Sequence, residues 1–282
     1  MKQQHGPNPD PMATVPTSAD NGAPAWHYPA DMHLHSTFSC DASATMEDHV
    51  RHAIRLGLTH VCFTEHFDAN PADEGCGYYR PDDSRNEVSR LQAAFGDRIR
   101  ILHGLEFAEP HLYPAQFEKM TARPYDFVLG STHWLGDMFV LDRERLGTFD
   151  PEALEARYYS QLEAMTAFGG FDAVAHMDYL RRGTGRDRWP EDVVRRIFGN
   201  MVRNGIALEI NTQHVRRSLP DAFPTPALAS LYAACGGSRI TFGSDGHHPP
   251  DTASGIEQTA LRYAAIPGLQ PGIFIERRFQ PV

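Results

Sequence analysis

DMHLH, residues 31–35, is the stretch that decides the fold of this chain. It predicts a short buried strand in which His33 and His35 stand two residues apart and therefore point to the same face. Two imidazoles on one face can bind one metal ion together. Asp31 precedes them and is expected to orient one of the two rings from behind. The stretch therefore predicts a metal site at the end of a strand.

The same combination of a buried strand and a metal-binding residue at its end recurs along the chain. Seven segments have this form: DMHLH with His33 and His35, THVCFTEH with His66, IRILHGLEF with Glu106, DFVLGS followed by His133, DAVA followed by His176, RITFGSDGH with Asp245 and His247, and GIALEINT, which has no obvious ligand but contains Glu209 and Asn211. Barrel enzymes built from parallel strands place their sites at the carboxyl ends of those strands. The pattern therefore predicts a metalloenzyme.

Helical segments are expected between the strands. Thr45 and Asp48 form a capping-box pattern before a helix that runs to Gly57, and Pro190 opens another that ends at Gly205. Further helices are expected near residues 83–95, 151–168, 225–235 and 252–264. Strands that are apolar on both faces and alternate with helices are typical of a parallel α/β barrel. With seven strands rather than eight, the predicted fold is a distorted seven-stranded (β/α)7 TIM-like barrel.

Composition limits the partners and the compartment. Residues 1–28 contain five prolines and few large apolar groups, so we expect a disordered Pro-rich tail there and a single domain over 29–282. A net charge of −10 disfavours nucleic acid and anionic membranes, and no apolar run approaches the ~18 residues of a membrane helix. Four cysteines without a CxxC pair favour a reducing, cytoplasmic location.

These motifs resemble the PHP family, the polymerase and histidinol phosphatase superfamily. The resembling stretches are DMHLHSTFSCDA, FTEH, HGLEF, GSTHW, AHMDYLRR, EINT and GSDGH, within residues 31–247. The resemblance implies the PHP fold and nine ligands for two or three divalent transition-metal ions (Zn, Mn or Fe). The nine counterparts in this chain are His33, His35, Asp41, His66, Glu106, His133, His176, Asp245 and His247.

The resemblance also implies how these ligands are shared. His33, His35, Glu106 and Asp245 would hold one ion. Glu106 would bridge to a second ion held with His133 and His247, and Asp41, His66 and His176 would form the third set. The candidate catalytic residues are Glu106, as the bridge, together with Asp245 and His247, which are candidates to assist protonation of the leaving alkoxide.

Within the family, the chain is most similar to the histidinol-phosphatase branch. The similar stretches are GSTHWL, AHMDYLRR and ALEINTQHVRR. That branch places arginines near the phosphate, and the matching substrate-binding candidates are Arg182 and Arg216, with Arg181 and Arg217 as neighbours. A guanidinium fork suits the geometry of a phosphate. The residues QHV before Arg216 depart from the branch, which more often has small or apolar residues there.

The expected function is a metal-dependent phosphomonoesterase that converts histidinol phosphate and water to histidinol and phosphate, in histidine biosynthesis. A water between two ions would attack the phosphorus. The expected partner is a small phosphorylated substrate, with no nucleic acid and no membrane. One alternative is a PHP phosphoesterase for a nucleotide or another small phosphate. Another is a non-catalytic PHP binding domain, which would be marked by lost ligands. The sequence leaves open the bound metals, the oligomeric state and the group that reads the substrate amine.

Overall fold

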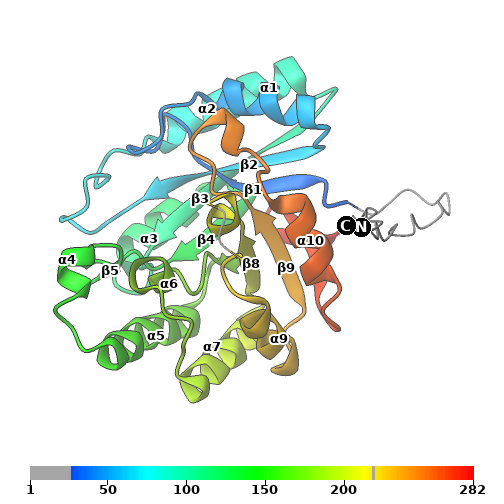
Figure 1. Ribbon diagram of the computed structural model, residues 1–282. Coiled ribbons are helices and arrows are strands. Elements are labelled where there is room, and N and C mark those ends of the chain that lie inside the picture. Colours follow the sequence, from blue (N-terminus) through cyan, green and yellow to red (C-terminus); the bar gives the residue numbers. More distant parts are fainter. Residues whose placement is uncertain (1–26, 218–219) are drawn as a thin grey trace, which may run out of the picture.

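The computed structural model describes residues 27–217 and 220–282 (Figure 1). Its elements in chain order are β1 (Ala30–Leu34), α1 (Met46–Leu56), β2 (His60–Phe67), α2 (Pro81–Phe95), β3 (Arg100–Ala108), α3 (Pro114–Thr121), β4 (Phe127–Ser131), β5 (Trp134–Leu135), β6 (Met138–Phe139), α4 (Arg143–Leu146), α5 (Pro151–Phe168), β7 (Ala173–Val174), α6 (Leu180–Thr184), α7 (Glu191–Asn204), β8 (Ala207–Asn211), α8 (Gln213–Arg216), α9 (Pro226–Ala234), β9 (Arg239–Gly243), the 3-10 helix η1 (Pro249–Asp251), α10 (Ile256–Ala264), β10 (Gln270–Ile275) and β11 (Arg278–Pro281). Within these ranges, none of the helices is both long and apolar enough to span a bilayer.

One mostly parallel sheet carries the site. Its nine strands follow the order β1-β2-β3-β4-β7-β8-β9-β10-β11. Neighbouring strands run parallel from β1 to β10, and only β11 is antiparallel to its neighbour. Seven of these strands correspond to the seven predicted ones, and β10 and β11 extend the sheet beyond them. Figure 1 shows α1 and α2 above the strands and α5, α7 and α9 below them.

The strands are covered on both faces, as their apolar runs predict. Phe63 on β2, Leu105 on β3 and Val128 on β4 are all fully buried. β2 and β3 pair in register along their whole common length, from His60 opposite Arg100 to Phe67 opposite Phe107. Burial of both faces is characteristic of parallel sheets covered by helices. This packing aligns the carboxyl ends of neighbouring strands at one edge.

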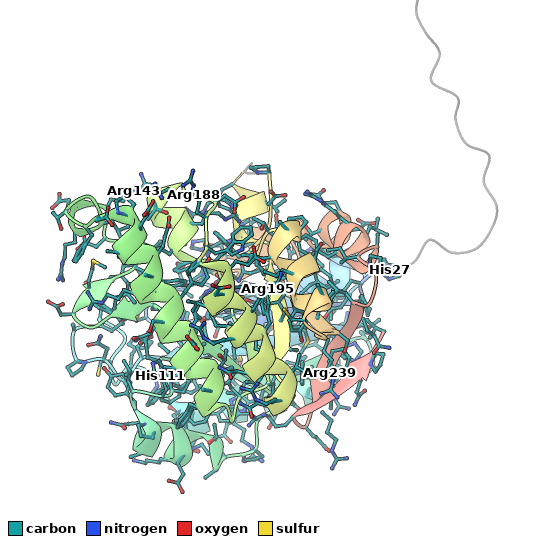
Figure 2. All side chains as sticks on the ribbon, turned by 90° about the horizontal axis from the view of Figure 1, so that it is seen from below. His27, His111, Arg143, Arg188, Arg195 and Arg239 are labelled. Atoms are coloured by element: carbon teal, nitrogen blue, oxygen red, sulfur yellow. The ribbon has the colours of Figure 1, made fainter. Side chains whose placement is uncertain are left out.

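The predicted helix signals act where they were expected. Thr45 caps α1 by accepting from the backbone N–H of Asp48, and Asp48 accepts in turn from the N–H of Thr45 at 3.1 Å. Gly57, with φ of +77°, ends the helix. Pro190 directly precedes α7 and Gly205 ends it. The remaining predicted helices correspond to α2, α5, α9 and α10, whereas α3 and the β5–β6 hairpin had no predicted counterpart. Figure 2 shows α5 and α7 side by side.

The predicted domain boundary needs a correction at Tyr28. Of the predicted tail, residues 1–26 lie outside the described residues, but Tyr28 belongs to the core. It is 3% exposed, and its hydroxyl donates to the carbonyl of Gly272 at 2.8 Å. Its ring meets that of Phe242 on β9 edge-on, with 4.7 Å between centroids. A single aromatic beside a proline-rich segment has no periodicity, which is why composition assigned it to the tail.

Backbone hydrogen bonds join the end of β1 to the segment that follows β9. The N–H of Asp245, just after β9, donates to the carbonyl of His33 on β1 at 2.9 Å. The N–H of His35 donates to the carbonyl of Gly246, also at 2.9 Å. These bonds bring the DMHLH and GSDGH motifs together although they are about as far apart in sequence as the domain allows.

Candidate metal centre

The nine predicted ligands converge at the carboxyl ends of the strands. Eight of them follow or end β1, β2, β3, β4, β7 or β9, and Asp41 lies in the loop after β1. Side-chain contacts connect all nine into one continuous cluster. Glu106 stands at its centre and is 1% exposed, whereas Asp41 lies on the open side and is 52% exposed.

A first group of donors surrounds one oxygen of Glu106. The Nε2 atoms of His33 and His35 are 2.9 Å apart, and they lie 3.3 Å and 3.5 Å from Glu106 Oε2. Asp245 Oδ1 completes the group at 3.4 Å from His35 Nε2. This grouping matches the set that the resemblance implies for one ion.

A second group surrounds the other oxygen of Glu106. His133 Nε2 is 3.4 Å from Glu106 Oε1, and His176 Nε2 is 2.9 Å from the same oxygen. The two ring nitrogens are 3.5 Å apart. The expected partner here was His247, so His176 takes its place. The physical reason is that β7 is the sheet neighbour of β4, which sets the two histidines side by side.

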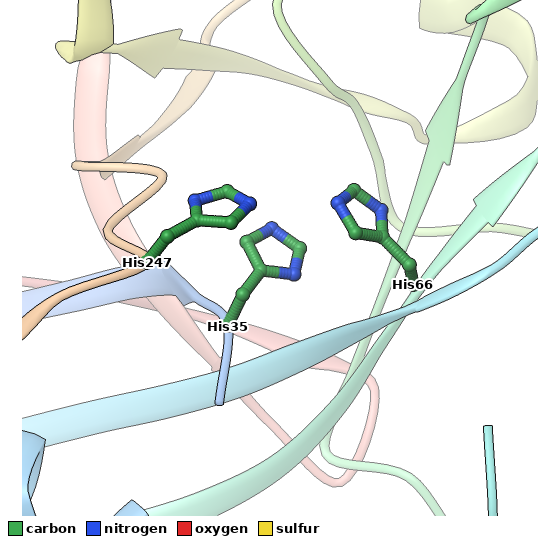
Figure 3. A group of neighbouring side chains, drawn as sticks. All are labelled: His35, His66 and His247. Atoms are coloured by element: carbon green, nitrogen blue, oxygen red, sulfur yellow. The ribbon is translucent and has the colours of Figure 1, made fainter. Parts of the chain in front are cut away.

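A third group lies toward the open side. Asp41 Oδ2 is 3.1 Å from His247 Nε2 and 3.6 Å from His66 Nε2. Figure 3 shows the rings of His35, His66 and His247 turned toward one another. The expected third set contained His176 instead of His247. His247 falls here because the end of β9 lies beside β1, whose following loop carries Asp41.

The donor set fits transition-metal ions. Donor pairs 2.9–3.6 Å apart are near the ~3.4 Å that two ligands about 2.1 Å from one tetrahedral ion would have. His66 Nδ1 lies 2.9 Å from Glu106 Oε2, and its Nε2 faces Asp41, so the ring of His66 connects the third group to Glu106. Imidazole and carboxylate donors suit Zn, Mn and Fe.

The electrostatics of the cluster favour the metal-binding form of some donors and not of others. For four imidazoles, nearby carboxylates outweigh burial and raise the pKa, so these rings must release a proton when metal binds: His33, His66, His133 and His247. Burial opposes ionisation of Glu106, but His33, His66 and His133 hold its pKa well below the usual value. Burial and the neighbouring His66 and His247 lower the pKa of His35, so its imidazole is neutral. A carboxylate and a neutral imidazole are the ligand forms of these side chains.

Glu209 orients the cluster, a role that sequence reasoning assigned to Asp31. The Nδ1–H of His33 donates to Glu209 Oε1 at 2.5 Å, which turns His33 Nε2 toward Glu106. Glu209 Oε2 also accepts from the backbone N–H of His176 at 2.8 Å. Among the described residues Asp31 has no hydrogen bond to an imidazole; it accepts from the N–H of Ser244 at 2.9 Å and of Ala253 at 2.7 Å. Asp31 therefore holds the loop that carries Asp245.

Two more supporting contacts were missed. Ser39 lies 3.2 Å from His35 Nδ1 and donates to Glu65 Oε2 at 2.6 Å, so Glu65 orients His35 through a hydroxyl. Asp68 Oδ1 lies 3.5 Å from His133 Nδ1. Only their positions in the sequence could have indicated these supporting residues: Glu65 directly precedes His66, and Asp68 follows it by two residues. Short polar loops after strands carry many such contacts, so spacing alone does not single them out.

The arginines near the cluster have different surroundings. Arg182 donates to Gln213 Oε1 at 2.5 Å, and Gln213 donates to Asp245 Oδ2 at 2.9 Å. Arg216 donates to the carbonyls of Ser244 and Asp245 at 2.6 Å and 3.2 Å and pairs with Asp251, so only part of its fork is free. Arg217 is exposed; partial burial and the positive charges of Arg182 and Arg216 lower its pKa. Arg181 is tied to Asp178 and to the carbonyl of Ala222.

A cavity of about 410 Å³ opens beside the donors. Its walls include the donors Asp41, His66 and His133, the ring of Tyr179, and residues of the loop after β2 and of the β5–β6 hairpin. A volume of this size holds a small organic ligand. The donors are therefore reachable by a small substrate.

The comparisons with known proteins agree on one family. The PHP domain profile matches residues 31–213. The histidinol-phosphatase of Lactococcus lactis is 31% identical over 234 residues, which cover 77% of this chain and 83% of that protein. A probable histidinol-phosphatase of Deinococcus radiodurans is 26% identical over 89% of this chain and 98% of its own length.

Among solved structures, the histidinol phosphate phosphatase of Lactococcus lactis complexed with Zn, L-histidinol and phosphate superposes with a TM-score of 0.77. The alignment has 26% identity and covers 89% of this chain and 98% of that chain. A putative histidinol phosphatase from Listeria monocytogenes has a TM-score of 0.67 at 15% identity, which shows likeness of fold.

Proposed function

This chain belongs to the PHP domain family, and on that premise we propose that it hydrolyses L-histidinol phosphate to L-histidinol and phosphate at a centre of two or three divalent transition-metal ions. The observation that carries the proposal is the position of Glu106, whose two oxygens each face a separate group of imidazoles. A carboxylate in this position can bridge two ions. The likeness to histidinol-phosphatases supports the substrate.

The chain's own residues divide the work. Divalent ions held by the three donor groups would supply Lewis acidity, which lowers the pKa of a water and neutralises phosphoryl charge. Glu106 links the first and second groups, and Asp245 and His247 contribute donors to the first and third. Glu209, Glu65 and Asp68 keep the imidazoles aimed at the centre.

The phosphate is bound by the arginines that retain N–H groups without a partner among the described residues. Arg182 stands on α6 and Arg217 just after α8, and partial burial together with the positive charge of Arg182 lowers the pKa of Arg217. Fixed guanidinium groups stabilise the charge that develops on a transferring phosphoryl group. Arg216 acts by holding the backbone of Ser244 and Asp245. In this assignment Arg216 positions a metal ligand. Arg217 makes the phosphate contact that was expected of Arg216.

We also infer that the sheet closes into a barrel between β1 and β9. The hydrogen bonds between His33 and Asp245 and between His35 and Gly246 support closure, as does the parallel bridge of Leu34 with Gly246. The barrel then has the seven strands β1, β2, β3, β4, β7, β8 and β9. The four cysteines, all free thiols, support a reducing cytoplasm as the place of action.

Phosphate release from a panel of phosphomonoesters tests the proposal. The metal-reconstituted protein should hydrolyse L-histidinol phosphate with a kcat/KM at least about tenfold above that for p-nitrophenyl phosphate and nucleoside monophosphates, the range a few specific contacts provide. A nucleotide that is preferred by a wide margin would overturn the substrate, and a lack of all phosphatase activity would overturn the reaction.

A further inference from the structure

The cavity beside the metal donors has a second wall of distinct chemistry. It is formed by the loop after β2 and by the β5–β6 hairpin, and it carries the carboxylates of Asp68, Asp73 and Glu74 and the rings of Trp134 and Phe139. Among the described lining residues there is no lysine or arginine. The arginines assigned to phosphate lie elsewhere, on α6 and after α8. The site therefore has a cationic side and an acidic, aromatic side.

The aromatic part of this wall is held rigidly. Trp134 Nε1 donates to Asp73 Oδ2 at 2.6 Å, and the N–H of Gly75 donates to Asp73 Oδ1 at 2.6 Å. Asn70 donates to the carbonyl of Gly136 at 3.0 Å, which ties the loop to the hairpin. Trp134 and Phe139 pack with 5.6 Å between ring centroids. Asp73 is thus committed to positioning the indole ring.

The other two carboxylates, of Asp68 and Glu74, have oxygens that can still accept hydrogen bonds. Asp68 is 6% exposed and lines the cavity, yet only its Oδ1 is engaged, by His133; its Oδ2 has no hydrogen bond to any described group. Glu74 is exposed at the cavity edge, and within the described residues its carboxylate has no hydrogen bond or ion pair. Unpaired carboxylates on a wall whose described residues include no lysine or arginine attract a cationic group.

We propose that this wall is the specificity subsite, which receives the cationic end of the substrate. Glu74 and the free oxygen of Asp68 bind the ammonium group, and Trp134 and Phe139 flank the imidazole ring. Carboxylates bind an ammonium by charge-assisted hydrogen bonds, and aromatic faces favour a flat, partly cationic ring. This inference rests on the proposed function, because it names the groups that read the leaving alcohol.

The test compares two substrates that differ only in the amine. L-histidinol phosphate and its deaminated analogue, 3-(imidazol-4-yl)propyl phosphate, are assayed with the metal-loaded wild type, with Glu74→Gln and with Glu118→Gln. Glu118 is an exposed carboxylate on α3 outside the cavity and serves as the matched control. Glu74→Gln should narrow the ratio of kcat/KM between the two substrates roughly tenfold, mainly through KM, because it removes a charged hydrogen bond. Glu118→Gln should leave the ratio unchanged.

The outcomes separate the subsite from the function. A wild type that prefers the amine substrate by the same ratio as Glu74→Gln overturns the subsite and leaves the proposed function standing. A wild type that prefers p-nitrophenyl phosphate to both imidazole substrates overturns the proposed function, and the subsite with it. Glu74→Lys, which reverses the charge, is a second test. It should lower the ratio of kcat/KM for the amine substrate to that for the deaminated analogue further than Glu74→Gln does.

Discussion

Glu106 is the residue on which the centre depends. Its Oε2 faces His33, His35 and His66, and its Oε1 faces His133 and His176. Its side chain is almost fully buried. Its neighbours keep it ionised against the effect of burial.

Replacing Glu106 by Gln should therefore abolish turnover and leave the fold in place. The amide has nearly the same shape, but it has one neutral oxygen and no second anionic donor. We expect kcat to fall by more than about a hundredfold, the upper range for residues that only support a ligand. Phosphate release, elemental analysis and circular dichroism measure activity, metal content and fold. Strong residual activity at normal metal content would contradict the bridging role.

Glu209 provides a prediction that the sequence motif alone would not suggest. Glu209→Gln weakens the acceptor for His33 Nδ1–H and should reduce zinc affinity or activity about 10- to 100-fold. Titration with a competing chelator measures the affinity. Glu257→Gln, an exposed change at the start of α10, is the control and should bind zinc as the wild type does. Equal affinities in all three proteins would remove Glu209 from the site.

The three arginines should differ in kind as well as in degree. Arg182→Ala and Arg217→Ala should each lower kcat/KM roughly 10- to 100-fold for every phosphomonoester, because in the proposed assignment they bind the phosphate and not the leaving group. Arg216→Ala should instead lower the metal content, since the backbone of Asp245 loses its support. Arg195→Ala, on α7 (Figure 2), is the control. If Arg216→Ala has normal metal content but binds phosphate more weakly, Arg216 is a phosphate-binding residue and not a support for Asp245.

At the scale of elements, the segment before β1 stabilises the sheet. Tyr28 contacts both β9 and β10, through its ring contact with Phe242 and its hydrogen bond to Gly272. Tyr28→Ala should lower the free energy of unfolding by about 3 kcal/mol, the usual cost of removing a large aromatic from a core. Urea denaturation measures this difference. Proteins that begin at His27 and at Pro29 should differ in the same direction, and equal stability of the two would show that Tyr28 contributes nothing.

At the scale of the whole molecule, the sequence predicted the strands and the donors but not how the donors are shared. Buried strands ending in His, Asp or Glu are visible as a pattern, because both the strand run and the ligand type are local. The sharing of His176 and His247 depends on which strand ends are neighbours in space, and that follows from sheet order. Glu209, Asp68 and the β5–β6 hairpin were missed because single polar contacts in loops have no period.

The proposed hydrolysis of L-histidinol phosphate depends on a centre of two or three metal ions. This dependence is tested by the rate of L-histidinol phosphate hydrolysis as a function of metal ions bound per chain, starting from chelated protein and refilling it stepwise. We expect no turnover without metal and full turnover only when two to three ions are bound, because the two oxygens of Glu106 face separate groups of imidazoles and Asp41 faces a third. Full turnover in chelated protein, or with a single ion per chain, would contradict it.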